Sequence, residues 1–224
     1  PLRPRGQGCP AGGGVYFRRD GIDYGASKSC PFDIQTSWTL GGMPMSNLII
    51  KAAVRTLFTF TSREKALERS KLLLGQYLRL AEGLSEKGGQ LRVEVPPMRG
   101  VDEDMRWWSF FMILEHNAIV NRSITASVVQ LANGELLSGP ATIDVKKGVM
   151  PSGAADESQI GLFADSVTMH IASVESLKQL RGTRTSPHPI FGNFDAHKWN
   201  CMFAFHLGLH LPQAKYVADR AKAE

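Results

Sequence analysis

The sequence lacks any run of 18 or more apolar residues, and no early apolar stretch follows its first arginines. The first absence excludes a membrane-spanning helix, and the second predicts that no secretory signal is present. Cysteine is also scarce, because only Cys9, Cys30 and Cys201 occur, and they lie far apart in the chain. Three such residues cannot form a disulfide framework. The expected compartment is therefore the reducing cytoplasm.

No cluster of lysine and arginine is present either. The 26 Lys and Arg outnumber the 21 Asp and Glu, but the net charge of +5 is scattered along the chain. A nucleic-acid footprint needs basic residues gathered on one face. We therefore expect neither a nucleic acid nor a membrane among the partners. With 224 residues, of which 43% are apolar and 21% charged, the chain fits one domain, or one domain with an appendage.

Residues 1–42 differ in composition from the rest of the chain. They hold 9 of the 22 glycines and 4 of the 12 prolines, and their apolar residues follow no regular period. This composition is typical of irregular or low-complexity chain. We expect a leader at 1–42, which is either a tail, an upstream translated stretch or cloning scar, or a native extension folded over the domain. The domain itself is expected over 43–224.

Four long segments show the apolar period of amphipathic helices, and a bundle of helices is the fold this pattern favours. The predicted fold is therefore all-α, a four-helix bundle with an irregular N-terminal extension. A shorter apolar segment at 48–60 is predicted to be a helical lead-in, and strand-like alternation is weak except at 91–95. The four long helices are expected near 61–88, 102–133, 156–180 and 193–217.

Local signals predict where these helices begin and end. Thr61 with Glu64 three residues later has the spacing of a capping box. The pairs Gly88-Gly89 and Asn133-Gly134 are predicted to end the first and second helices. The long connection at 134–156 has no strong periodicity, and such connections often serve as lids or binding loops.

The histidine pattern is the main chemical signal. His206 and His210 are four residues apart, so they lie about 40° apart on one helix face. This spacing offers two imidazoles to one metal ion. His116 lies in the apolar stripe of the second helix and is expected to face the same core. Three neutral imidazoles can hold Zn²⁺ or a similar divalent ion and leave a coordination position open.

The alternative is that these histidines are hydrogen-bonded core residues, as most single buried histidines are. His170, also inward-facing, could be a fourth ligand, a partner behind the ligands, or such a core residue. Gln213, about one turn after His210, is expected to hydrogen-bond near the site. The spacer 207–209 lacks the glutamate of the H-E-x-x-H motif, so a zinc-protease mechanism is not indicated.

Other aromatic and histidine residues receive weaker assignments. Trp199, like Trp107 and Trp108, is expected to pack in the core or to form a wall of the pocket. His197 lies about 180° around the helix from His206 and is expected to face away from the site. His188 stands between two prolines and is expected to shape a turn.

Two segments resemble signatures of the DinB-like (YfiT-like) metal-binding superfamily. The run Phe-Met-Ile-Leu-Glu-His-Asn at 111–117 resembles the family's second-helix signature. The segment 188–192, Trp199 and the run 206–213 are similar to its fourth-helix signature, and the resemblance covers about residues 46–220. It implies a four-helix bundle, often a homodimer, in which His116, His206 and His210 hold a divalent metal such as Zn, Ni or Fe.

The resemblance also implies a chemistry. Members include metal-dependent transferases and isomerases that use small thiols such as bacillithiol, mycothiol or glutathione. One hypothesis is therefore a metal-dependent thiol S-transferase that takes a low-molecular-weight thiol and an electrophile. The other is a non-catalytic, stress-related bundle that acts through protein interaction and whose histidines are structural. No catalytic residue beyond the metal ligands is assigned.

Overall fold

The computed structural model describes residues 44–135 and 148–223. These residues are mostly helical, which confirms the all-α prediction. The predicted leader at 1–42 and most of the predicted connection, 136–147, lie outside the described residues. The elements, in chain order, are α1 (Pro44–Phe60), α2 (Arg63–Ala81), α3 (Glu86–Gln90), the short 3₁₀ helix η1 (Glu103–Met105), α4 (Phe110–Ala132), α6 (Ser158–Ser176), β1 (Ser186–His188), β2 (Gly192–Phe194) and α7 (Ala196–Ala221).

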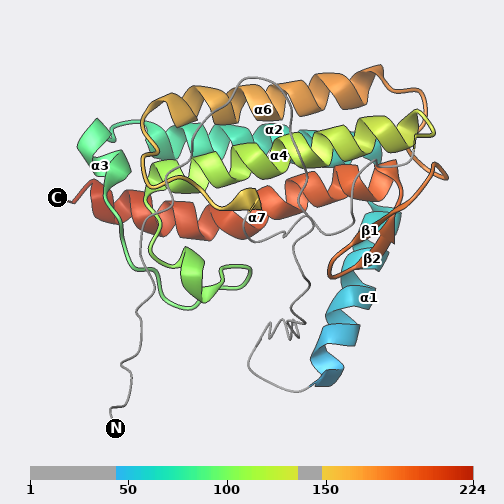
Figure 1. Ribbon diagram of the computed structural model, residues 1–224, viewed down its shortest axis with the longest axis horizontal. Coiled ribbons are helices and arrows are strands. Elements are labelled where there is room, and N and C mark those ends of the chain that lie inside the picture. The colour runs from blue at the N-terminus through green and yellow to red at the C-terminus, as the bar shows by residue number, and fades with distance from the viewer. Residues whose placement is uncertain (1–43, 136–147, 224) are drawn as a thin grey trace, which may run out of the picture. The chain divides into compact units, whose positions relative to one another are not determined.

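The four long helices α2, α4, α6 and α7 lie side by side (Figure 1). Contacts between them join α4 to α6 and α7, and α2 to α7 and α6, so each of the four packs against two others. The apolar stripes read from the sequence meet in the space between them, where removal of apolar area from water is the main stabilising term. Fully buried side chains from all four helices fill this core, among them Tyr77, Ile113, Phe163 and Leu207.

Two of the predicted helix ends were wrong. The N-cap of α2 is Ser62, whose hydroxyl accepts the Lys65 N–H, whereas the Thr61 hydroxyl donates to the Leu57 carbonyl of α1. The Gly88-Gly89 pair does not end α2, which stops at Ala81; both glycines lie in α3. Glycine at 89 has a packing reason, since an added Cβ would lie 2.1 Å from the Phe111 ring.

The start of the second long helix was also misplaced. Helix α4 begins at Phe110 with Ser109 as its N-cap, and the acidic residues near 103 form η1 instead. Its end agrees with prediction, because Asn133 is the C-cap and Gly134 follows with φ of 78°. Helix α6 is shorter at both ends than the predicted 156–180.

A β-hairpin occupies the stretch predicted to be a turn. Strands β1 and β2 pair antiparallel, with His188 opposite Gly192, and Gly192 has φ of 81°. Asp195 then caps α7, where its carboxylate accepts the Lys198 N–H at 2.9 Å. The hairpin therefore leads directly into the helix that carries His206 and His210.

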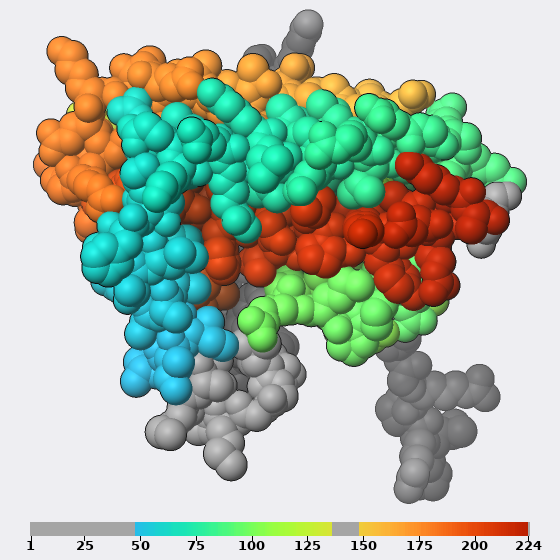
Figure 2. Space-filling model, turned by 180° about the vertical axis from the view of Figure 1, so that it is seen from behind, coloured from blue at the N-terminus to red at the C-terminus, as the bar shows by residue number. Residues whose placement is uncertain are grey.

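Helix α1 packs against the hairpin and α7. Its Phe58 ring lies 5.7 Å from the Phe194 ring and 5.6 Å from the Phe205 ring. Seen from behind, α1 (blue) extends beyond α2 and α7 (Figure 2). Among the described residues, no helix is both long and apolar enough to cross a membrane.

Candidate metal centre

Three histidines converge in the core between α4 and α7. His116 comes from α4, and His206 and His210 come from successive turns of α7. Each offers a ring nitrogen within 4.8 Å of the others, and the ring centroids are 4.8 to 5.3 Å apart. In a tetrahedral zinc site with bonds of about 2.0 Å, such nitrogens lie about 3.3 Å apart. The three ring nitrogens therefore lie close enough together to hold one ion among them.

Burial keeps these imidazoles neutral. His116 and His210 are each 2% exposed, and His206 is half-buried. Loss of solvent, and then the nearby His210, lowers the pKa of His116 to about 3. Burial also lowers the pKa of His210 and, together with the neighbouring histidines, brings the pKa of His206 well below its usual value. A neutral imidazole is the form that ligates a metal, so the trio is ready to bind at pH 7.

The His116 ring is oriented by a backbone carbonyl. Its Nδ1–H donates to the Val149 oxygen at 2.7 Å. Because a carbonyl can only accept, Nδ1 carries the single proton of the neutral ring and Nε2 is left with a free lone pair. This Nε2 atom is buried and has no hydrogen-bond partner among the described residues. Such an atom is costly to bury unless something else binds it.

The His210 ring is oriented by a glutamine. Gln213 is fully buried; its Nε2 donates to the Met105 carbonyl at 2.8 Å, and its Oε1 lies 2.9 Å from His210 Nδ1. Since the amide nitrogen is committed to Met105, the oxygen must face His210 and accept the Nδ1–H. The Nε2 lone pair of His210 is therefore free for a ligand. This is the arrangement by which metal-ligating histidines are held in place.

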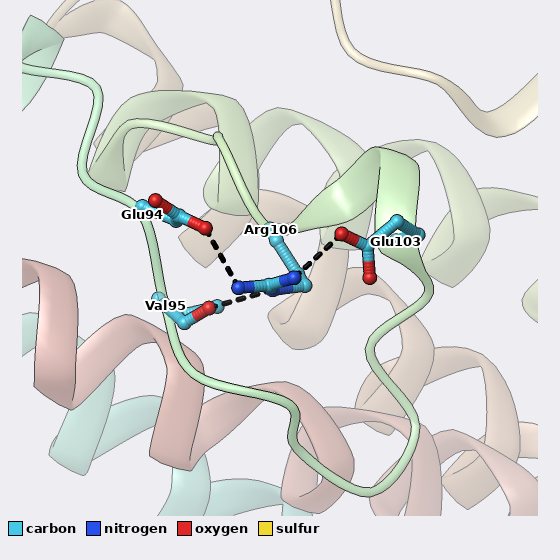
Figure 3. Close-up of polar contacts among 4 residues, drawn as sticks. All are labelled: Glu94, Val95, Glu103 and Arg106. Carbon is cyan, nitrogen blue, oxygen red and sulfur yellow. Dashed lines mark hydrogen bonds and ion pairs between the residues drawn. The ribbon is translucent and has the colours of Figure 1, made fainter.

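An arginine in turn holds the loop that carries Met105 (Figure 3). The Arg106 Nε donates to the Val95 carbonyl at 2.8 Å, and the Val95 N–H donates to the Arg106 carbonyl at 2.9 Å. The guanidinium also pairs with Glu94 at 2.7 Å and with Glu103 at 2.5 Å. Arg106 is therefore connected to His210 through Met105, the residue before it, and through the hydrogen bonds of Gln213.

His206 is the least constrained member of the trio. Its Nδ1 is buried and has no hydrogen-bond partner among the residues that the structure describes. Beside the trio, the buried Trp108 ring lies 5.0 Å from the His116 ring and stacks 6.4 Å from the His210 ring. The sequence left core packing and a pocket wall open for Trp108, because nothing in the residue pattern distinguishes the two.

The segment after the undescribed part of the connection is anchored next to the trio. Val149 binds His116, and the N–H and hydroxyl of Ser152 both donate to the Glu115 carboxylate, at 2.8 and 3.0 Å. Glu115 directly precedes His116 on α4. The end of the predicted 134–156 connection therefore lies against the site, and its carbonyl at Val149 sets the tautomer of a candidate ligand.

His170 does not join the trio. Its Nδ1 lies 2.9 Å from the Thr125 hydroxyl and its Nε2 lies 3.1 Å from Asn200 Oδ1. The ring stacks on Phe203 with 3.6 Å between centroids. Both nitrogens are thus in use, as expected of a hydrogen-bonded core histidine, which is one of the alternatives that the sequence left open.

Trp199 and His197 contact other parts of the molecule. The Trp199 Nε1–H donates to the Ser186 hydroxyl at 2.8 Å, and its ring packs against the hairpin residues His188 and Phe194. His197 is buried against α1, with its Nε2 within 3.1 Å of the Phe58 and Thr61 carbonyls. The described contacts give neither residue a place beside the three candidate ligands.

Comparisons with protein-family models, with curated proteins and with solved structures found no significant match. The resemblance to the DinB-like superfamily therefore remains a prediction that rests on the residues quoted above. The three-histidine cluster does not depend on this resemblance, because its geometry comes from the structure alone.

Proposed function

We propose that the protein binds one divalent metal ion through His116, His206 and His210, within a DinB-like four-helix bundle. The observation that carries this proposal is the His116 Nε2 atom, which is buried, unprotonated and without a partner among the described residues while two further imidazoles face it. An unsatisfied buried polar atom costs about 1–3 kcal/mol. A bound ion removes that cost and explains why three polar rings share an apolar core.

The donor set favours Zn, Ni or Fe over the hard ions. Imidazole nitrogens suit these metals, whereas Mg²⁺ and Ca²⁺ prefer oxygen ligands. Three protein ligands leave a position open for a small molecule, and an ion of this kind lowers the pKa of a thiol or water bound there. The protein's own part is to orient the rings through Val149 and Gln213 and to cover one side with Trp108.

The reaction we propose is transfer of a low-molecular-weight thiol to an electrophile, in a homodimer. The thiol releases its proton to solvent, its sulfur forms a bond to the electrophilic carbon, and the leaving group departs with the displaced electron pair. Support for this class comes from the resemblance of 111–117 and 188–213 to the DinB-like signatures, together with an open three-histidine site. Support for the dimer comes from that resemblance alone.

A thiol-by-electrophile screen tests the reaction. Metal-loaded protein is incubated with glutathione, bacillithiol or mycothiol and a chromogenic aryl or alkyl halide, and thioether formation is measured. We expect turnover with at least one thiol, abolished by His116→Ala and retained by His197→Gln, which replaces a buried histidine outside the trio. Equal rates in the His116→Ala and parent proteins, or no rate above the metal-free blank, would contradict the transferase.

A second candidate function rests on helix α1. Its Phe60 and Leu48 side chains are 82% and 72% exposed, and Ile49 and Leu57 are also exposed. Exposed apolar side chains gathered on one element mark interaction surfaces more often than isolated ones do. This favours a role in protein interaction. Sedimentation of the parent protein and of the variant Leu57→Glu/Phe60→Glu tests it. The same sedimenting mass for both proteins would count against it.

A further inference from the structure

An open hollow lies between helix α1 and the turn that joins the two strands of the hairpin. Five residues of α1 and residues 190–192 of the turn line it. Its volume is about 490 Å³, which is within the usual range for small-molecule sites. Neither α1 nor the turn carries a candidate metal ligand, so the hollow is a separate feature of the molecule.

The hollow is basic. Lys51 and Arg55 both line it, and their spacing of four residues puts them on the same face of α1. None of the eight described lining residues is acidic. The ion pairs within the described part of the chain include neither of the two cations. Two positive charges therefore border the hollow without a counter-charge from the residues that the structure describes.

The hairpin holds the Arg55 side chain in place. The Arg55 Nη1 donates to the Phe191 carbonyl at 2.9 Å. Gly192 leaves room for this contact, because an added Cβ would lie 2.9 Å from Nη1, and its φ of 81° suits glycine. The turn is itself held by His188, whose Nδ1 accepts the N–H groups of Ile190 and Phe191 at 3.1 and 3.3 Å. The guanidinium is therefore positioned before any ligand binds.

Most of this guanidinium is available to a ligand. The described residues accept a hydrogen bond only from its Nη1, so the edge formed by Nε and Nη2 is open. Such an edge matches a carboxylate through two parallel hydrogen bonds. The other walls are largely apolar, with Leu48 and Ala52 on α1 and Ile190 and Phe191 in the turn. Because Leu48 is 72% exposed, a hydrocarbon lying on it would remove apolar area from water.

We propose that this hollow binds a small carboxylic acid with an apolar tail. The carboxylate accepts from the open edge of Arg55, Lys51 supplies a second positive charge, and the tail lies on Leu48 and the turn. A small inorganic anion has no part that covers the apolar walls. A neutral hydrocarbon leaves both cations without a counter-charge. The site does not depend on the metal centre, and its test does not require metal.

Titration of the full chain with monomeric octanoate tests the proposal, with backbone amide shifts followed by NMR. We expect saturable binding, with the largest shift changes at residues 48–56 and 190–192. Acetate keeps the charge and lacks the tail, whereas octanol keeps the tail and lacks the charge. Each should bind at least about tenfold more weakly than octanoate, through loss of buried methylene groups or of the charged hydrogen bonds.

Two matched pairs of variants locate the site. Lys51→Gln should weaken octanoate binding about three- to tenfold, whereas Lys65→Gln, at an exposed lysine of α2 outside the hollow, should leave it unchanged. Ala52→Phe should fill the hollow and abolish binding. Its control is Ala53→Phe, because Ala53 is the next residue of α1 and is also exposed but does not line the hollow.

Several results would overturn the proposal. No saturable binding of octanoate to the parent protein would do so, as would equal affinity for acetate and octanoate. Unchanged octanoate affinity in both Lys51→Gln and Ala52→Phe would place the ligand elsewhere. Binding to phosphatidylglycerol vesicles without binding to free octanoate would show that this face recognises a lipid surface instead.

Discussion

Gln213 and His210 form a hydrogen bond whose direction is set by a second hydrogen bond, from Gln213 to Met105. The Gln213 oxygen lies 2.9 Å from His210 Nδ1 because its amide nitrogen donates to the Met105 carbonyl. A glutamine could otherwise turn its amide either way, and the histidine could carry its proton on either nitrogen. One contact on η1 therefore decides which nitrogen of His210 can ligate.

Replacing Gln213 with leucine should weaken metal binding about 10- to 100-fold, the usual effect of removing the partner of a ligand histidine. The substitution preserves bulk but leaves the Met105 carbonyl and His210 Nδ1 without partners, so stability should fall by about 1–3 kcal/mol. Competition with a chromophoric chelator measures the first effect, and urea unfolding the second. Unchanged metal affinity in a folded variant would show that Gln213 does not orient His210 for metal binding.

Replacing Arg106 with alanine should act on the same site from farther away. The side chain is 16% exposed and holds both Val95 and Glu94, so its loss should cost about 1–2 kcal/mol and lower metal affinity several-fold by loosening the Met105 loop. Glu103→Gln is the control, since Glu103 is 82% exposed and such ion pairs contribute about 0–1 kcal/mol. Equal effects from the two variants would contradict the role assigned to Arg106.

Two glycines should respond oppositely to alanine. At Gly89 the new Cβ would lie 2.1 Å from the buried Phe111 ring, so Gly89→Ala should destabilise by about 1–3 kcal/mol. At Gly75, inside α2, the nearest atom is the end of Arg79 at 3.4 Å, so Gly75→Ala should stabilise by about 0.5–1 kcal/mol. Thermal unfolding of both variants measures the difference. A neutral Gly89→Ala would refute the close contact between α3 and α4.

Acid should release the metal and unfold the protein together. The pKa of His116 is lowered to about 3 and that of His170 to about 4 in the folded state, whereas an unfolded histidine titrates near 6.5. As the pH falls below about 6.5, the unfolded chain takes up protons that the folded chain cannot, so stability is present above that pH and is lost on the way to pH 4.

Because the three ligand histidines stay neutral until the protein unfolds, metal release should follow the loss of helical circular dichroism. Both signals are recorded in one acid titration, with a chelator dye reporting the free metal. Release of the metal with a midpoint near pH 6.5, from protein that is still fully folded, would contradict the burial of the three histidines.

The sequence predicted the helical fold and the convergence of the trio for the same reason. Periodicity places His116 and His210 on the apolar faces of their helices, and faces of this kind must meet in the core. It also predicted the polar contact of Gln213, because a residue three positions after His210 lies on the same face.

The errors have equally physical causes. The cap at Thr61 was misplaced by one residue because Thr61 and Ser62 are adjacent hydroxyl residues that both suit an N-cap, and residue type alone cannot tell which of them caps α2. The Val149 and Met105 carbonyls that orient the ligands are backbone atoms, which leave no mark on residue type. The hairpin that positions His188 is three residues per strand, too short for any alternation to be read.

The most direct test of the account is the metal content of the purified, tag-free protein, measured by elemental analysis after incubation with Zn²⁺, Ni²⁺ or Fe²⁺ and gel filtration. The account predicts about one ion per chain in the parent protein and in His197→Gln, and none in His206→Ala or His210→Ala. A parent protein without metal, or variants that keep it, would contradict the proposal that these histidines form a metal centre.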